Sequence, residues 1–165
     1  MKLPEFEDCL KRRKIVRFLA AKKLAGKELD VARADLAASQ QSLKQKNYKW
    51  ATVQAYYTMF HAARTLLYHK GYREKSHYCL ILAMKEFYVS EGILEMRLVE
   101  SLQMAKAMRE GADYENTFDS KSAGKKGQAT VKGHFRIKIS LESLERPVPF
   151  SSFSSLALAL TRAAL

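Results

Sequence analysis

Hydrophobic residues recur at helical spacing along most of the first 115 residues, and the positions between them are mostly polar. This pattern predicts one helix over residues 5–25 and a second over 28–46, with a break at Asn47. A third helix is predicted over residues 48–70, because Gly71 is the kind of residue that ends a helix. Its inward-facing stripe consists of Trp50, Val53, Tyr57, Phe60, Arg64 and Leu67.

Two further helices follow from the same spacing. Ser76 is placed to cap a fourth helix, whose inner side carries His77, Leu80, Ile81, Met84, Phe87 and Tyr88. Gly92 separates it from a fifth helix, in which one face carries Leu94, Leu98, Leu102, Ala105 and Arg109. No proline lies between residues 5 and 146 to interrupt these helices. Short connections favour antiparallel neighbours, so we predict an all-α fold, an antiparallel bundle of about five helices.

The pattern changes near residue 115, which divides the chain into three predicted segments. Residues 1–115 form the helical bundle. Residues 116–146 form a basic, weakly specified last element, because its glycines weaken a helix. The alternation of Phe135, Ile137, Ile139 and Leu141 is typical of a strand, but a single strand would have no partner, so we favour a last helix. Residues 147–165 form a joint rich in proline and serine, followed by a short apolar tail.

The excess of positive charge indicates a polyanion as a possible class of partner. The chain has 29 Lys and Arg against 17 Asp and Glu, a formal net charge of +12. The excess gathers in two places: Lys11, Arg12, Arg13, Lys14, Arg17, Lys22 and Lys23, and then Lys121, Lys125, Lys126, Lys132, Arg136 and Lys138. Such surfaces attract polyanions without reading base sequence, because counterions are released from the phosphates. The alternative is a solvated basic face that only aids solubility.

The cysteines and the ends of the chain indicate a compartment. Cys9 and Cys79 are few and far apart in sequence, which argues against a disulfide framework or a zinc knuckle and favours a reducing compartment. The first eight residues lack the apolar run of a signal peptide, and residues 156–165 are too short for a membrane span. We therefore expect a soluble, cytoplasmic protein that does not associate with a membrane.

Two arginines on inward-facing helix stripes are the first candidates for a site, because a buried charge is costly without a partner. Asp113 lies four residues after Arg109 and can pair with it, whereas Arg64 has no acid nearby on its helix. Tyr57 and His61 lie close to Arg64 by helical spacing and would suit a stacked base or a held phosphate. The alternative is an arginine that reaches solvent at a dimer seam, with the rings as core filling.

Motifs for metals and common cofactors are missing from the sequence. It contains no glycine-rich phosphate loop, nucleophile elbow, His-Glu-x-x-His pair or Cys-x-x-Cys pair. His61, His69 and His77 recur every eight residues, but that step turns the first two ~80° apart on one helix, and Gly71 separates the third. We predict neither a metal site nor a cofactor.

Two segments resemble the prokaryotic HEPN family. The first is Tyr56-Tyr57-Thr58-Met59-Phe60-His61-Ala62-Ala63-Arg64-Thr65-Leu66-Leu67, followed by Gly71 and by Lys75-Ser76-His77; the second is Arg109-Glu110-Gly111-Ala112-Asp113-Tyr114. Their order and spacing match the family over residues 28–115, the HEPN-like core. The resemblance implies an antiparallel bundle that commonly forms a homodimer. It also implies pairing with a minimal nucleotidyltransferase in a toxin–antitoxin or defence module.

The resemblance further implies a metal-independent ribonuclease with an Arg-x(4–6)-His motif, often assembled across the dimer. There the histidine acts as acid or base or positions the 2′-hydroxyl, and the arginine stabilises the phosphorane. This sequence departs from that motif, because Arg109 is followed by Asp113 and Tyr114 and by no histidine at that place. His77 begins a neighbouring helix, from which it can approach Arg64 or Arg109.

The literal match to that motif lies elsewhere, in Arg64-x4-His69 of the third predicted helix. Five residues of helix turn by ~500°, so the two side chains point about 140° apart. We therefore do not combine Arg64 and His69 into one site.

Two functional hypotheses result. The first is a dimer that binds RNA or a nucleotide and has ribonuclease activity, with Arg109 and His77 as catalytic candidates. Its predicted binding residues are Tyr57, His61, Arg64, Asp113 and Tyr114. The alternative is a non-catalytic subunit that binds and regulates a nucleotidyltransferase, with Tyr114 as a residue that is modified. A bundle with a purely structural role is a third interpretation.

Overall fold

A computed structural model describes the backbone of residues 3–114 and the side chains of residues 3–112. The predicted last element, 116–146, and the predicted tail, 147–165, lie outside the described residues. Along the chain the elements are α1 (Pro4–Lys11), β1 (Ile15–Arg17), α2 (Ala21–Lys44), α3 (Tyr48–His69), β2 (Tyr72–Glu74), α4 (His77–Met84), the π-helical turn η1 (Lys85–Val89) and α5 (Met96–Tyr114).

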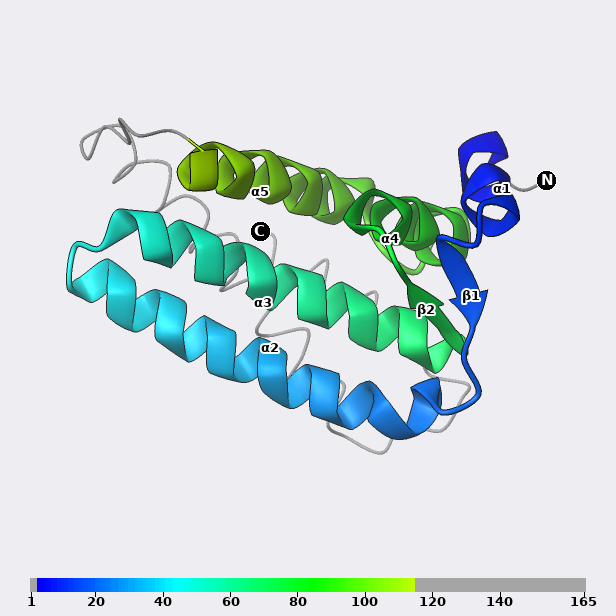
Figure 1. Cartoon of the computed structure of the whole chain (residues 1–165), viewed down its shortest axis with the longest axis horizontal. Coiled ribbons are helices and arrows are strands. Elements are labelled where there is room, and N and C mark those ends of the chain that lie inside the picture. Colours follow the sequence, from blue (N-terminus) through cyan, green and yellow to red (C-terminus); the bar gives the residue numbers. More distant parts are fainter. Residues whose placement is uncertain (1–2, 115–165) are drawn as a thin grey trace.

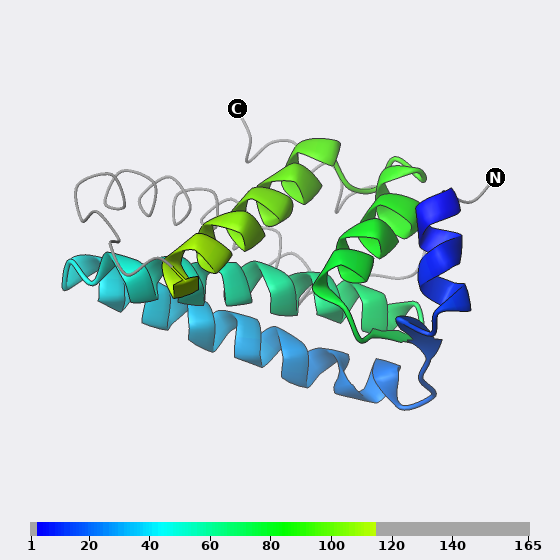
Figure 2. The ribbon, with the colours of Figure 1, turned by 45° about the horizontal axis from the view of Figure 1, so that its top comes forward.

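The helix α3 is the centre of the bundle. It forms a long antiparallel hairpin with α2 on one side and packs against α4 and α5 on the other (Figures 1 and 2). Small residues let α2 and α3 approach closely, since Ala32 and Ala62 are buried against each other beside Leu29. The main core lies between α3, α4, α5 and α1, and its largest fully buried side chains include Tyr56, Phe6, Leu67, Leu80 and Met84. The prediction of an all-α bundle of about five helices is confirmed.

The boundaries between the later helices follow the glycines. Gly71 ends α3 with φ +78° and Gly92 precedes α5 with φ +69°, so both adopt the left-handed conformation that glycine tolerates best. Ser76 occupies the predicted cap position, but its side chain makes no capping hydrogen bond. The predicted fourth helix is divided, because α4 ends at Met84 and a π-helical turn continues to Val89.

The single helix predicted over residues 5–25 is wrong. The chain there forms α1, β1 and the first turn of α2, and β1 pairs antiparallel with β2. Four consecutive cations from Lys11 to Lys14 end the helical stripe, and Arg13 takes φ 53° between α1 and β1. The β-branched pair Ile15 and Val16 then favours a strand. The prediction that Trp50 faces inward is also wrong, because its relative exposure is 52%.

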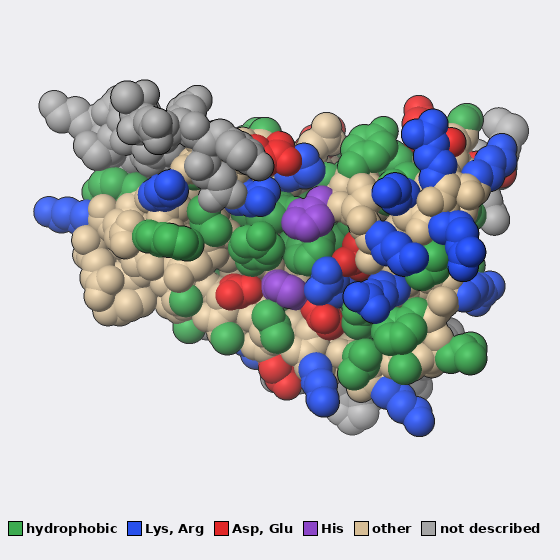
Figure 3. Space-filling model, in the orientation of Figure 1, with side chains coloured by type: hydrophobic (Ala, Val, Ile, Leu, Met, Phe, Trp, Pro, Cys, Tyr) green, Lys and Arg blue, Asp and Glu red, His purple; other side chains and the backbone are tan. Residues whose placement is uncertain are grey.

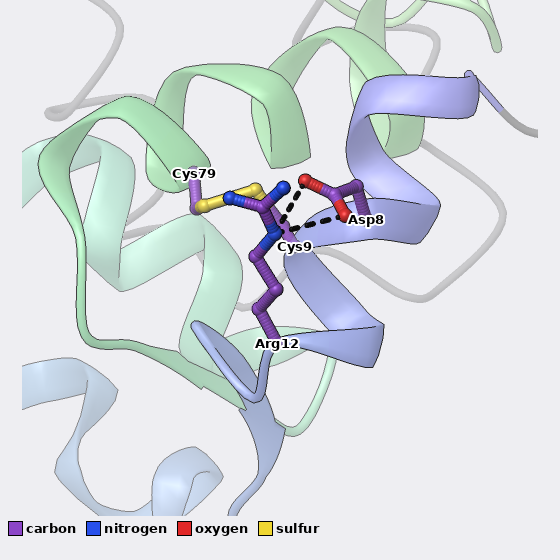
Figure 4. The surroundings of a disulfide bond; sticks show 4 residues. All are labelled: Asp8, Cys9, Arg12 and Cys79. Carbon is purple, nitrogen blue, oxygen red and sulfur yellow. Dashed lines mark hydrogen bonds and ion pairs between the residues drawn. A yellow bond between two sulfur atoms is a disulfide. The ribbon is translucent and has the colours of Figure 1, made fainter.

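The expectation of unpaired cysteines is also wrong. Cys9 of α1 and Cys79 of α4 form a disulfide bond, with their Cα atoms 5.9 Å apart (Figure 4). The two cysteines are far apart in sequence, but tertiary packing brings α1 and α4 into contact and so allows the bond. A second tie joins the start of α1 to the π-helical turn after α4, since the backbone N–H of Leu3 donates to Oε2 of Glu86 in η1 at 2.9 Å. Among the described residues, no helix has the length and apolar character that crossing a membrane requires.

Reduction of the Cys9–Cys79 bond is expected to lower the free energy of unfolding by about 2–5 kcal/mol, because the bond closes a long loop of chain. Urea unfolding followed by circular dichroism, with and without dithiothreitol, measures this change. The matched control is the double variant Cys9→Ala/Cys79→Ala, on which the reductant should have no effect. An unchanged midpoint for the reduced wild type would contradict the expectation.

Candidate functional site

Tyr56 of α3 and His77 of α4 form the centre of the candidate site. The Tyr56 hydroxyl and Nδ1 of His77 share a short hydrogen bond. The imidazole also stacks on the ring of Phe60, with centroids 4.3 Å apart and planes inclined by 28°. Tyr56 and Phe60 are almost fully buried, whereas His77 is only partly covered. The histidine is therefore held by two rigid residues of the central helix while one side stays accessible.

Arg109 reaches the same place from α5. Its guanidinium carbon lies 5.9 Å from the ring centroid of Tyr56 and 6.0 Å from that of Tyr57. Both distances fall within the range of a cation–π contact. The two catalytic candidates thus meet on Tyr56, which bonds His77 through its hydroxyl and contacts Arg109 through its ring. We call Tyr56, Phe60, His77 and Arg109 the Tyr56 cluster.

The surroundings of the Tyr56 cluster favour a neutral histidine. Burial lowers the pKa of His77 from its ordinary value, and the positive charges of Arg109, Arg64 and Lys106 lower it further, against a smaller opposite effect of Glu110. Burial disfavours the charged form of Tyr56 too and so raises the pKa of Tyr56, whose hydroxyl keeps its proton at neutral pH. An uncharged imidazole can accept a proton at neutral pH, which a general base requires.

The hydrogen bond to Tyr56 uses one ring nitrogen of His77 and leaves the other for a ligand. Within residues 3–112, no hydrogen bond involves Nε2 of His77. If Nδ1–H donates to the tyrosine oxygen, Nε2 carries the lone pair; if the tyrosine donates, Nε2 carries the proton. The cluster can therefore present either a base or a hydrogen-bond donor at the same position.

Arg64 has acidic partners that its own helix does not supply. Its Nε and Nη2 atoms lie 2.8 and 2.5 Å from Oε1 of Glu74, which belongs to β2 and is almost fully buried. Its Nη1 atom lies 3.5 Å from Oε2 of Glu28 in α2, and its guanidinium lies 4.4 Å from the centroid of Phe60. The absence of a local acid was thus no guide to its partners, because these come from two other elements.

His61 lies on the acidic side of this arrangement. Its Nδ1 is 2.7 Å from Oε2 of Glu28, and its Nε2 is 3.8 Å from Oδ2 of Asp35. Burial raises the pKa of Asp35, while His61 acts in the opposite direction. Carboxylates therefore surround His61 and part of Arg64, whereas the cations near His77 leave that end more suitable for an anion.

The structure brings most of the predicted site residues together. Tyr57, His61, Arg64, His77 and Arg109 all contact the aromatic group around Tyr56 and Phe60. The side chains of Asp113 and Tyr114 lie outside the described residues, although the backbone of α5 extends to Tyr114. His69 is exposed near the end of α3 and is not among these contacts.

Tyr56, Glu74 and Glu28 were missed as residues of this region. Tyr56 was visible in the sequence as the first member of a tyrosine pair, but only the fold shows that its hydroxyl faces the start of α4. Figure 3 shows histidine side chains near the middle of this face, between hydrophobic side chains and a broad group of Lys and Arg. Within residues 3–112, no group of three His, Cys, Asp or Glu side chains is arranged to hold a metal ion.

Comparison with known protein families identifies the family to which this chain is similar. The HEPN domain model matches residues 27–133, which is more than half of the chain. The chain belongs to the HEPN family. The resemblance inferred from the tyrosine pair, Lys75-Ser76-His77 and the segment after Arg109 is thereby confirmed. The family match begins next to the predicted core boundary at residue 28 and continues beyond residue 115.

Two relatives from Methanocaldococcus jannaschii are similar to this HEPN protein. One, named "Putative toxin MJ0605", is 30% identical over 86 residues, which are 52% of this chain and 64% of the relative. The other, named "Putative toxin MJ0142", is 28% identical over 95 residues, which are 58% of this chain and 65% of the relative. The chain thus spans less than two thirds of the length of either relative. No solved structure matches the chain.

The pKa of His77 is expected to lie below 6.5, the ordinary value for histidine. Substitution Arg109→Gln should raise it, without restoring 6.5, because burial remains. The unfolded chain takes up a proton at position 77 before the folded chain does, so this group makes folding less favourable as pH falls below 7. NMR titration of the imidazole measures the pKa, with Lys49→Gln as the control. A pKa that Arg109→Gln leaves unchanged would contradict the assigned electrostatics.

Removing Arg64 is expected to destabilise the fold by about 3–5 kcal/mol, because Arg64→Ala leaves the buried Glu74 carboxylate without its main partner. Arg12→Ala is the matched control. It removes an exposed ion pair with Asp8 and should cost less than about 1 kcal/mol. Urea unfolding of the two variants measures the difference, and equal costs would show that the Arg64–Glu74 pair is not important for stability.

Proposed function

We propose that this HEPN protein is a metal-independent endoribonuclease of a toxin–antitoxin or defence module. The observation that carries the proposal is that His77 and Arg109 both contact Tyr56, which brings an acid–base group and a cation to one buried residue. The names of the two relatives support a toxin. RNA supplies both groups that such a site acts upon, a hydroxyl to deprotonate and a phosphate to neutralise.

In the proposed reaction, Nε2 of His77 removes the proton of a 2′-hydroxyl while Nδ1–H donates to Tyr56. The bond from the 2′-oxygen to phosphorus forms and the bond from phosphorus to the 5′-oxygen breaks. The products are a 2′,3′-cyclic phosphate and a 5′-hydroxyl, whose oxygen takes its proton from water. The hydroxide that this leaves takes up the proton held by His77, which returns the imidazole to its neutral form. Arg109 stabilises the added negative charge on the phosphorane oxygens. Tyr57 offers a partly exposed ring on which a base can stack.

Arg64 and His61 have a supporting part in this proposal. Glu74 and Glu28 neutralise much of the charge of Arg64, which makes the guanidinium a weaker phosphate ligand than that of Arg109. Its contacts with Glu74 and the face of Phe60 instead help to fix the ring on which His77 stacks. Asp113 and Tyr114 remain proposed binding residues at the end of α5.

The proposal includes a homodimer and a minimal nucleotidyltransferase as the second component of the module. Both partners come from the family resemblance. Light scattering after gel filtration measures the first, and co-purification after co-expression measures the second. Stable association with the nucleotidyltransferase, together with no cleavage of RNA, would favour the alternative of a non-catalytic regulatory subunit.

The full chain is expected to cleave single-stranded RNA in the presence of EDTA. His77→Ala should lower the rate about 10²–10⁴-fold, the usual contribution of a general acid or base, and Arg109→Ala should lower it to a similar extent. The rate should fall as pH drops through the pKa of His77, because only the neutral imidazole accepts the proton. Initial rates on a fluorophore-labelled RNA, measured between pH 5 and 8, provide these values.

Two control variants each remove a histidine or an arginine that lies outside the Tyr56 cluster. His69→Ala removes an exposed histidine of α3, and Arg97→Ala removes an exposed arginine from the same helix as Arg109. Both should retain the wild-type rate. Cleavage that survives His77→Ala, or that requires a divalent cation, would refute the proposed mechanism.

A further inference from the structure

The segment before the family match carries a concentrated positive charge. Between Cys9 and Lys27 there are eight Lys and Arg and no Asp or Glu; the cations are Lys11, Arg12, Arg13, Lys14, Arg17, Lys22, Lys23 and Lys27. All eight are exposed. Figure 3 shows Lys and Arg side chains gathered over the side of the molecule where Figure 1 places α1, β1 and β2. Seven of the eight precede residue 27, where the family match begins, so their charge is added to the matched HEPN region.

Pairing of the strands brings further cations to the same face. Val16 lies opposite Arg73 and Ile15 opposite Glu74, and one pair beyond these the backbone N–H of Lys75 donates to the carbonyl oxygen of Lys14 at 2.8 Å. This continuation of the ladder places Lys14 and Lys75 opposite each other. Alternate residues of a strand share a face, so Lys14, Arg73 and Lys75 lie together on the outward face of the pair. The opposite face carries the buried residues Ile15 and Glu74.

The like charges on this face have no acid to compensate them in the strand pair. Like charges directly opposite each other destabilise two paired strands. The one carboxylate of the two strands, Glu74, is turned inward and bonded to Arg64, and Asp8 of α1 already pairs with Arg12. An external polyanion would relieve this repulsion.

Aromatic rings accompany the cations. The guanidinium of Arg73 lies 5.7 Å from the centroid of Phe18. On the other face of the strand pair, the guanidinium of Arg17 lies 4.5 Å from the centroid of Tyr72. Positive groups interleaved with rings suit a single-stranded nucleic acid, whose phosphates meet the cations and whose unpaired bases stack on flat groups. An acidic protein would use the charges but has less need of the rings.

The end of β2 connects this face to the Tyr56 cluster. Lys75 is followed by Ser76 and then by His77, the first residue of α4. A strand advances about 3.3 Å per residue, so a chain lying along β2 is led to His77 within a short distance.

We propose that Lys14, Arg73 and Lys75, the basic ribbon, bind the backbone of single-stranded RNA and guide it to His77 and Arg109. This inference rests on the proposed function for RNA as the substrate. It adds a binding surface of which the strand β1 lies outside the matched family region.

The test compares two triple variants of the full chain, each in a His77→Ala background that keeps the RNA intact. Lys14→Gln/Arg73→Gln/Lys75→Gln neutralises the basic ribbon. Lys44→Gln/Lys46→Asn/Lys49→Gln neutralises three exposed lysines around the α2–α3 turn, with Asn at position 46 because φ there is 60°. Fluorescence anisotropy with a labelled 12-nucleotide poly-U gives the Kd at several salt concentrations.

The ribbon variant should bind at least about tenfold more weakly near 0.1 M salt, and the slope of log K against log salt should flatten by about 2, or about 0.7 for each lost phosphate contact. The control variant should change the affinity less than about twofold. The charge-conserving variant Lys14→Arg/Arg73→Lys/Lys75→Arg should keep both the affinity and the slope. Circular dichroism verifies that all variants are folded.

The outcomes separate this inference from the proposed function. Equal losses in the ribbon and control variants overturn the ribbon, even if His77→Ala abolishes cleavage. A selective loss in the ribbon variant supports the ribbon, even if the wild type leaves RNA uncut and the proposed function fails. An absence of RNA binding by the wild type overturns the ribbon as an RNA-binding surface. Displacement of the RNA by a 12-residue glutamate peptide at equal concentration also overturns it, because an acidic protein would then be the partner.

Discussion

The buried ion pair between Arg64 and Glu74 joins the parts of the molecule that matter most for the candidate site. Glu74 belongs to β2 and Arg64 to the central helix, so the pair fixes the strand that leads into α4. The same guanidinium covers one ring of the Tyr56 cluster, that of Phe60. A partnered charge of this kind specifies one arrangement strongly, because a carboxylate removed from water has no substitute for its cation. The position of His77 therefore depends on a contact in which His77 takes no part.

The Tyr56 cluster shows how a helical bundle can bring an imidazole and a guanidinium together around one buried tyrosine. The helix α3 contributes the two rings, α4 the imidazole and α5 the guanidinium, and the rings contact both polar groups. Glu28, Asp35 and Glu74 lie toward Arg64 and His61, whereas the positive charges of Arg109 and Lys106 outweigh that of Glu110 on the side of His77. Burial is the main cause of the lowered pKa of His77, and the cations on its side of the helix face lower it further.

Helical periodicity was sufficient to predict the long elements, because α2, α3 and α5 each carry a repeating inner face. It failed for residues 5–25, where a strand of three residues is too short to produce a pattern and depends on pairing with residues far along the chain. The same limit applies to the site. Tyr57, His61 and Arg64 could be grouped from helical spacing, whereas the contacts of Tyr56 with His77 and of Arg64 with Glu74 join different elements and follow only from tertiary packing.

The strand pair also has a consequence for the order of folding. The α2–α3 hairpin needs only local contacts across a short turn, whereas β1 must find a partner more than 50 residues away, on the far side of that hairpin. Closing so long a loop has a large entropic cost until its ends already lie near each other. Collapse of the hairpin shortens that distance, so α1 and β1 dock onto a nucleus that the rest of the bundle has formed. The segment of α1 and β1 is then the last part to be secured, and the bond between Cys9 and Cys79 afterwards holds α1 to the bundle.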